Sequence, residues 1–170
     1  KFGKAEIKTE NNITQVKVKI ETGESFFLKT ERGSDLHDWN YYDTAGNEME
    51  ITGIWKVSFE KGGPSLPKES EMENLQSWTE LGSEAKAFSG SAIYEIKFNK
   101  PDGEADNWKL DLGDVSESAQ VWINDKFIGI ECAVLFQRKL GKLQEGKNSL
   151  RIKVINLAPY RIRSVYYSNL

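Results

Sequence analysis

Hydrophobic and polar residues alternate along much of this chain, beginning near its N-terminus. Val16, Val18 and Ile20 are separated by Lys17 and Lys19. A period of two is typical of a strand with one apolar face. The polar residues 22–24 then lead into a second apolar run at 25–30, so the pattern predicts a β-hairpin over residues 16–30.

The alternation returns more sharply from residue 54 onward. Glycine, asparagine and aspartate separate its segments at intervals typical of an all-β sandwich or barrel. Strands and helices do not alternate, which argues against an α/β fold. The polar stretch 64–87 is poorly periodic, and at most a helical turn is expected within 68–76. The expected strands lie at 54–59, 92–98, 108–112, 119–123, 127–130 and 150–154.

A loop-like segment at 33–47 marks a weak boundary. We therefore expect two parts. Residues 1–50 hold the hairpin and loop, and they pack on a neighbouring domain or belong to a preceding one. Residues 51–170 form the sandwich.

Composition removes several classes of protein. The 170 residues carry 23 Lys and Arg against 26 Asp and Glu, so no basic field favours nucleic acid. No run of 18 apolar residues predicts a membrane span. The single cysteine, Cys132, excludes an intramolecular disulfide and a cysteine-based zinc site. The chain starts at Lys1 without a signal-peptide pattern, as expected of a processed product or an excised piece.

Three local motifs resemble functional sites, and each has a simpler structural explanation. Residues 141–148 nearly match a phosphate-binding loop, but Asn148 stands where a magnesium-binding hydroxyl is needed, so we expect a turn. Asp35, His37 and Asp38 could ligate a metal, but their spacing favours a solvated turn. Asp111 is expected to face away from its apolar neighbours and Asp114 to cap a turn, rather than to catalyse glycoside hydrolysis as a pair.

Aromatic residues in predicted loops leave two alternatives open. Their rings could stack on sugars, or they could anchor the loops to the core. Trp122 is out of phase with the apolar face of its strand, so it covers the other face or meets a neighbour. The loop aromatics are Trp39, Tyr41, Tyr42, Trp78 and Tyr160.

An ordered series of short strings carries a family resemblance over nearly the whole chain. Together they resemble the C-terminal galactose-binding-like β-sandwich of large bacterial glycoside hydrolases, above all the α-L-rhamnosidase-like enzymes and relatives with a family 2 type sugar-binding domain. The strings are GIWKVSF (53–59), GGP (62–64), LQSWTE (75–80), FSGSAIY (88–94), LDLGDV (110–115), AQVWINDK (119–126), GKNSL (146–150) and VINL (154–157).

The resemblance implies a jelly-roll sandwich of a periplasmic, cell-surface or secreted bacterial enzyme. It implies that the catalytic acids lie in another domain, which the sandwich braces. Some related sandwiches bind sugars and many carry a structural calcium, whereas no other cofactor is implied. Two segments depart from the family pattern: Cys132 stands for a Trp, Val134 and Leu135 for prolines, and Tyr160 for an Asn.

We therefore expect a non-catalytic accessory β-sandwich that braces a catalytic domain and can bind carbohydrate. An arginine fork suits a uronate carboxylate, and a glutamate accepts hydroxyl protons. One alternative is a free-standing cell-surface module that binds protein through Trp122 and the hairpin. The other is a complete small hydrolase. The expected carbohydrate-binding residues are Trp78, Glu131, Arg138, Tyr160 and Arg161.

Overall fold

The computed structural model describes residues 2–20, 25–33, 35–41, 48–105, 107–115, 117–132 and 136–156. The chain divides into two compact units, Lys1–Asn47 and Glu48–Leu170, and each is described by itself. None of the helices in these ranges is long and apolar enough to cross a membrane.

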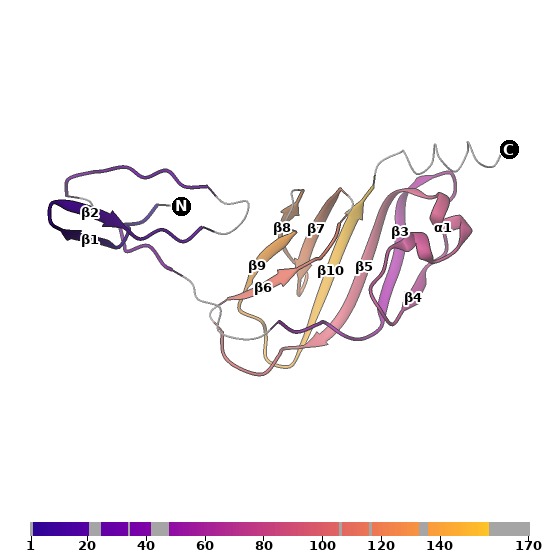
Figure 1. Ribbon diagram of the computed structural model, residues 1–170. Coiled ribbons are helices and arrows are strands. Elements are labelled where there is room, and N and C mark those ends of the chain that lie inside the picture. The colour runs from indigo at the N-terminus through magenta and orange to yellow at the C-terminus, as the bar shows by residue number, and fades with distance from the viewer. Residues whose placement is uncertain are drawn as a thin grey trace. The chain divides into compact units, whose positions relative to one another are not determined.

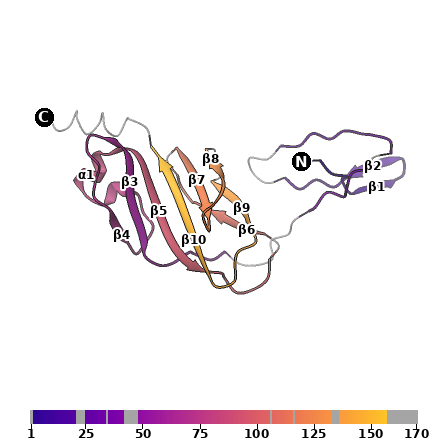
Figure 2. The same cartoon turned by 180° about the vertical axis from the view of Figure 1, so that it is seen from behind.

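The larger unit is built from antiparallel sheets (Figures 1 and 2). In its described part, six strands form the main sheet. Their order is β4 (Ser70–Met72), β3 (Trp55–Gly63), β5 (Ser89–Asn99), β10 (Lys147–Ile155), β7 (Ser118–Ile123) and β8 (Lys126–Glu131). A second sheet pairs β6 (Trp108–Asp111) with β9 (Gln137–Gly141). The all-β prediction and the expected β-sandwich are thus confirmed.

One face of the main sheet forms the core. The register aligns Val57, Tyr94, Ile152 and Val121 across four strands, and all four are buried. Cross-strand partners share a face of a sheet, which explains this apolar layer. Both views show β6 and β9 beside β7 and β8, with α1 (Ser83–Ala87) beside β3 and β4. The core is therefore covered by β6 and β9 on the side of β7 and β8, and by α1 on the side of β3 and β4.

The opposite face of the main sheet is mostly polar, apart from Ile93, Ile155 and its β7–β8 side. A row of cross-strand neighbours runs from Lys56 through Glu95, Arg151 and Trp122 to Phe127. The Arg151 guanidinium carbon lies 4.7 Å from the Trp122 ring centroid, and the Phe127 ring lies 5.4 Å from it. The out-of-phase Trp122 therefore covers the face away from the core.

Two glycines allow β3 and β5 to approach closely beside a register shift. A Cβ on Gly62 would lie 2.2 Å from the Ser89 carbonyl oxygen, and one on Gly90 would lie 2.1 Å from the Lys61 carbonyl oxygen. Because both obstacles are backbone atoms, neither position tolerates a larger residue without moving a strand.

The polar stretch 64–87 differs from its prediction. The strand β4 lies within the segment expected to be helical, and the helical turns come later, in η1 (Trp78–Glu80) and α1. Glu71 of β4 pairs with Lys56 of β3, so pairing with a neighbouring strand decides this structure. Local propensity could not reveal it.

The smaller unit contains the predicted N-terminal hairpin, but at a different position. Its strands are β1 (Ile7–Glu10) and β2 (Ile13–Val16), not the pair expected within residues 16–30. Asn11 and Asn12 both have positive φ, 53° and 61°, as a two-residue hairpin turn of the favoured hand requires. Residues 17–20 and 25–30 are not strands, and the expected turn at 22–24 lies outside the described residues.

The Tyr41 hydroxyl explains why the hairpin ladder ends where it does. It accepts a hydrogen bond from the Glu6 amide at 3.1 Å and donates one to the Lys17 carbonyl at 2.7 Å. The Lys17 amide still donates a hydrogen bond of 2.9 Å to the Glu6 carbonyl, so the Tyr41 hydroxyl takes the place of the second backbone bond of this pair, beyond Ile7 and Val16. Lys4 instead bridges to Asp38 of segment 35–41.

Candidate functional site

Two of the expected sugar-binding residues face each other across the sandwich. Glu131 ends β8 and pairs with Ala119, which is fully buried on the core face of the main sheet. Arg138 lies on β9 and pairs with the buried Leu110, so it shares the inward face of the small sheet. The register thus brings a carboxylate and a guanidinium to the gap between the layers.

The Arg138 guanidinium is held by two partners on β8. Its Nε forms an ion pair with Glu131 Oε1, and its Nη2 donates a hydrogen bond of 2.8 Å to the Ile130 carbonyl. The Glu131 side chain is 14% exposed and that of Arg138 is 33% exposed. We name this arrangement the interlayer pair. The interlayer pair fixes β9 to β8. It also orients the Arg138 guanidinium, because both contacts restrain this one group.

The interlayer pair depends on a glycine in β8. A Cβ on Gly129 would lie 2.5 Å from Arg138 Nη2 and 2.7 Å from its Cζ. The guanidinium therefore occupies space that any side chain at position 129 would take. Sequence reasoning missed this role of Gly129, although a glycine inside a strand signals close approach by another group.

In the acidic segment beside the site, the turn is capped by Asp111 and not by Asp114, which was expected to cap it. The Asp111 carboxylate accepts a hydrogen bond from the Gly113 amide at 2.8 Å and one from Gln137 Nε2 at 2.5 Å. Asp111 thus ties the end of β6 to the start of β9. Cys132, directly after Glu131, is an exposed free thiol.

Trp78, another expected sugar-binding residue, is part of the core. It is 4% exposed, and its ring contacts Phe59, Phe88 and Tyr94 at centroid distances of 6.1–6.4 Å. Its ring therefore has no open face on which a sugar could stack, which corrects the expectation. The strands β10 and β7 also separate its partners on β3 and β5 from the interlayer pair on β8.

The position of Trp78 is supported by Tyr94. The Tyr94 hydroxyl accepts a hydrogen bond from the Trp78 amide at 3.0 Å and lies 3.4 Å from the Gln76 carbonyl oxygen. Burial raises the pKa of Tyr94 to about 12, and the bond from Trp78 opposes part of that rise. Tyr94 is thus a neutral core hydroxyl that anchors the loop before η1.

Tyr160 and Arg161, the remaining expected residues, lie outside the described residues. The last described residue, Asn156, follows β10 at the end of the sheet where Glu131 also lies. Ile155 pairs with Ser118 of β7, and the next residue of β7, Ala119, pairs with Glu131. Asn156 Oδ1 accepts a hydrogen bond of 2.8 Å from the Gly90 amide, which fixes the exit of β10.

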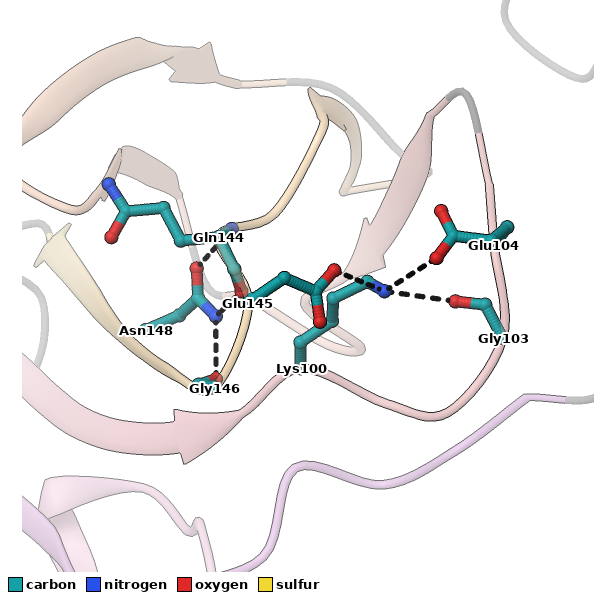
Figure 3. A network of polar contacts seen from close by, with 7 residues as sticks. All are labelled: Lys100, Gly103, Glu104, Gln144, Glu145, Gly146 and Asn148. Carbon is teal, nitrogen blue, oxygen red and sulfur yellow. Dashed lines mark hydrogen bonds and ion pairs between the residues drawn. The ribbon is translucent and has the colours of Figure 1, made fainter.

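The near-match to a phosphate-binding loop is a turn organised by Asn148 (Figure 3). The Asn148 side chain is buried, and its Oδ1 accepts bonds from the Gln144 amide at 3.0 Å and Asn124 Nδ2 at 2.9 Å. Its Nδ2 donates to the carbonyls of Gln144 and Gly146 at 2.9 and 3.1 Å. The expected turn at 141–148 is confirmed, since this side chain serves the backbone of its own loop.

Lys100 occupies the neighbouring cluster of oxygen atoms in Figure 3. Its Nζ lies 3.1 Å from the Gly103 carbonyl, 2.9 Å from Glu145 and 3.6 Å from Glu104. The bond to Glu145 raises the pKa of Lys100 most, against partial desolvation.

The structural calcium implied by the resemblance stays a prediction, because calcium also binds backbone and amide carbonyl oxygens. No three His, Cys, Asp or Glu residues gather in the described part of the chain. Where carboxylates do converge, at Glu104 and Glu145, the ammonium of Lys100 fills the position that a cation would take.

Comparison with solved structures relates the sandwich to parts of glycoside hydrolases. The rhamnosidase from Novosphingobium sp. PP1Y is similar over 77% of this chain and 13% of its own, with 26% identity and a TM-score of 0.64. A β-glucuronidase from an uncultured Clostridium sp. is similar over 70% of this chain and 24% of its own, with 22% identity and a TM-score of 0.53.

A third structure, the β-glucuronidase from Ruminococcus gnavus in complex with D-glucuronic acid, is similar over 66% of this chain and 23% of its own, with 18% identity and a TM-score of 0.51. No family model and no curated protein matches the chain. The chain therefore spans between 13% and 24% of the length of these three enzymes. Its class is that of a β-sandwich similar to a small part of glycoside hydrolases.

Proposed function

We propose that this chain is a non-catalytic accessory β-sandwich of an exported bacterial glycoside hydrolase. In this role it braces the catalytic domain and binds carbohydrate at the end of the sandwich that holds the interlayer pair. The observation that carries the proposal is that the structural match covers most of this chain but only a small part of each enzyme. Rhamnosidase and β-glucuronidases match most of this chain, whereas this chain matches at most about a quarter of each of the three.

The interlayer pair supplies the chemistry for the carbohydrate. A guanidinium held by Glu131 and the Ile130 carbonyl is already oriented, so little conformational entropy is lost when it meets an anionic group. A uronate carboxylate is the sugar substituent that an arginine fork recognises. Tyr160 and Arg161 remain predicted ligands, because their segment continues from Asn156 at the same end of the main sheet.

A protein-binding module is the second candidate function. One observation favours it: Trp122, Phe127 and Ile130 lie on the outer face of the main sheet, and Phe127 and Ile130 are each 51% exposed. An apolar group of this kind on a sheet face is typical of an interaction surface. Under this alternative the chain binds another protein and shows no affinity for sugars.

Titration calorimetry tests the carbohydrate proposal. Glucuronate, galacturonate, rhamnose, galactose and pectic oligosaccharides are titrated into the folded chain, with calcium and with a chelator. We expect saturable binding of uronates, lost in Arg138→Met and retained in Lys139→Met, because Lys139 is exposed on the opposite face of β9. Absence of binding by every sugar, with the fold intact by circular dichroism, overturns carbohydrate binding. Dependence of binding on calcium would establish the cation.

A further inference from the structure

We propose that the interlayer pair binds the non-reducing end of a uronate chain, because its two members recognise neighbouring groups of one sugar ring. Arg138 binds the carboxylate of the ring, and Glu131 accepts a hydrogen bond from the hydroxyl beside it, the 4-hydroxyl. The inference deepens the proposed function and rests on it, since that function supplies carbohydrate as the ligand.

The Arg138 guanidinium uses one of its two edges inside the protein. Its Nε pairs with Glu131 Oε1, and its Nη2 donates a hydrogen bond of 2.8 Å to the Ile130 carbonyl. These N–H groups share the side edge of the guanidinium plane, so the protein occupies that edge. The end edge, formed by Nη1 and the second N–H of Nη2, meets no acceptor among the described residues. This end edge can therefore bind both oxygens of a carboxylate.

Burial determines which atoms of the interlayer pair a ligand can reach. Arg138 Nε and Glu131 Oε1 are closed to solvent, although the two side chains are 33% and 14% exposed. Gly129 lies against Nη2 and the guanidinium carbon, so β8 covers that side of the group. The polar atoms left for a ligand are the end edge of Arg138 and Oε2 of Glu131.

Glu131 selects the group that stands beside the carboxylate of the ligand. A carboxylate that is ion-paired with arginine offers only acceptors, so it requires a donor such as a hydroxyl and repels a second carboxylate. In a uronate, the 4-hydroxyl stands on the ring carbon next to the one that carries the carboxylate. A ring bound by Arg138 therefore brings a donor toward Glu131.

The need for this hydroxyl selects chain ends. In a 1,4-linked uronate chain, the 4-oxygen of every internal residue lies in a glycosidic bond and has no proton to donate. Only the residue at the non-reducing end keeps the free hydroxyl. A site that must leave a buried acceptor unpaired rejects the wrong ligand strongly, so internal residues are excluded.

Titration calorimetry with modified uronates tests the inference. The ligands are glucuronate, galacturonate, the 4-O-methyl ether of each and the methyl ester of each. For the uronate that binds more tightly, we expect both modified forms to bind at least tenfold more weakly.

Two variants show whether Glu131 reads the hydroxyl. In Glu131→Gln the ratio between the affinities for the uronate and for its 4-O-methyl ether should shrink, because a neutral amide accepts a weaker hydrogen bond than a carboxylate does. Lys139→Met, on the opposite face of β9, should keep the ratio of the unmodified chain.

The outcomes separate this inference from the proposed function. Equal affinities for the uronate and its 4-O-methyl ether would overturn the inference and leave uronate binding intact. Equal weakening of both ligands by Glu131→Gln would also overturn it, because Glu131 would then only position Arg138. Tighter uronate binding by that variant would make Glu131 a competitor of the ligand, and equal affinity for the ester would remove the carboxylate as the recognised group. Absence of binding by every uronate would overturn the inference and carbohydrate binding together.

Discussion

The two layers of the sandwich meet where the Arg138 guanidinium lies against Gly129. The guanidinium fills the space that a side chain at position 129 would take. Gly129→Ala places a methyl group where the guanidinium lies, so the contacts of Arg138 with Glu131 and the Ile130 carbonyl are lost. We expect the free energy of unfolding to fall by about 1–3 kcal/mol, measured by urea denaturation.

A double-mutant cycle provides the control for this prediction. In an Arg138→Ala background the three guanidinium atoms nearest to the added methyl group are gone, while the strain of a side chain at the positive φ of Gly129, 156°, remains. Gly129→Ala should therefore still cost stability there, but less than in the unmodified chain. Equal costs in the two backgrounds would show that the backbone of β8, and not Arg138, requires the glycine.

The buried Tyr94 hydroxyl predicts a dependence of stability on alkaline pH. Its pKa is raised to about 12 in the folded chain, so the folded state holds the proton more tightly than the unfolded state. The stabilisation is complete below about pH 10, the unfolded value, and is lost as the pH rises toward 12. The loss amounts to roughly 2–3 kcal/mol. Urea unfolding between pH 9 and about pH 12 should show this extra loss in the unmodified chain and not in Tyr94→Phe; parallel curves for the two proteins would refute the assignment.

Burial assigns Trp78 a role in stability. Trp78→Ala should cost about 3–5 kcal/mol of folding free energy, because it leaves a cavity between Phe59, Phe88 and Tyr94. Sugar affinity per folded molecule should not change. If Trp78→Ala remained as stable as the unmodified chain but lost sugar binding, Trp78 would be a sugar-binding residue after all.

At the scale of the elements, long segments with alternating apolar residues were predictable, whereas the short strands β1, β2, β4 and β9 were not. The alternation at 92–98 and 119–123 predicted β5 and β7, because the register of the main sheet exposes one face of each to the core. The strands β1 and β2 are exposed on both faces. Their sequences therefore lack the alternation of apolar and polar residues that a buried face produces. The turn at Asn11 and Asn12 was their available signal.

Part of the candidate site was predictable from the sequence. Glu131 and Arg138 were selected by charge and by their place near a segment that departs from the family pattern, and the register brings them together. Trp78 was assigned to a loop, and only tertiary packing reveals that it anchors that loop to the core. The glycine inside β8 signals a close approach by another group, but the sequence does not show that Arg138 of the other sheet is that group.

The turn at Asn148 gives a prediction for the loops at the other end of the sandwich. Asn148→Ala removes four hydrogen bonds that this side chain makes with Gln144, Gly146 and Asn124. We expect a loss of about 2–4 kcal/mol, with faster amide exchange in residues 142–148. Lys142→Ala, on an exposed residue of the same loop, is the matched control. A loss confined to global stability, with unchanged local exchange, would contradict the organising role of this side chain.

At the scale of the whole molecule, the ordered strings suggested an enzyme family, and the structure confirms the all-β architecture that they implied. Comparison with solved structures supports a relation between this chain and a small part of glycoside hydrolases. The activity therefore belongs, in our proposal, to a domain beyond this sandwich.

A turnover screen tests whether this chain is catalytically inactive by itself, as its proposed role as an accessory domain requires. The purified, folded chain is incubated with aryl rhamnosides, aryl glucuronides and natural polysaccharides, and product release is compared with a protein-free control. We expect no release above that control. Turnover that a single substitution such as Asp111→Asn or Glu131→Gln abolishes would contradict it and would make this chain a small hydrolase in its own right.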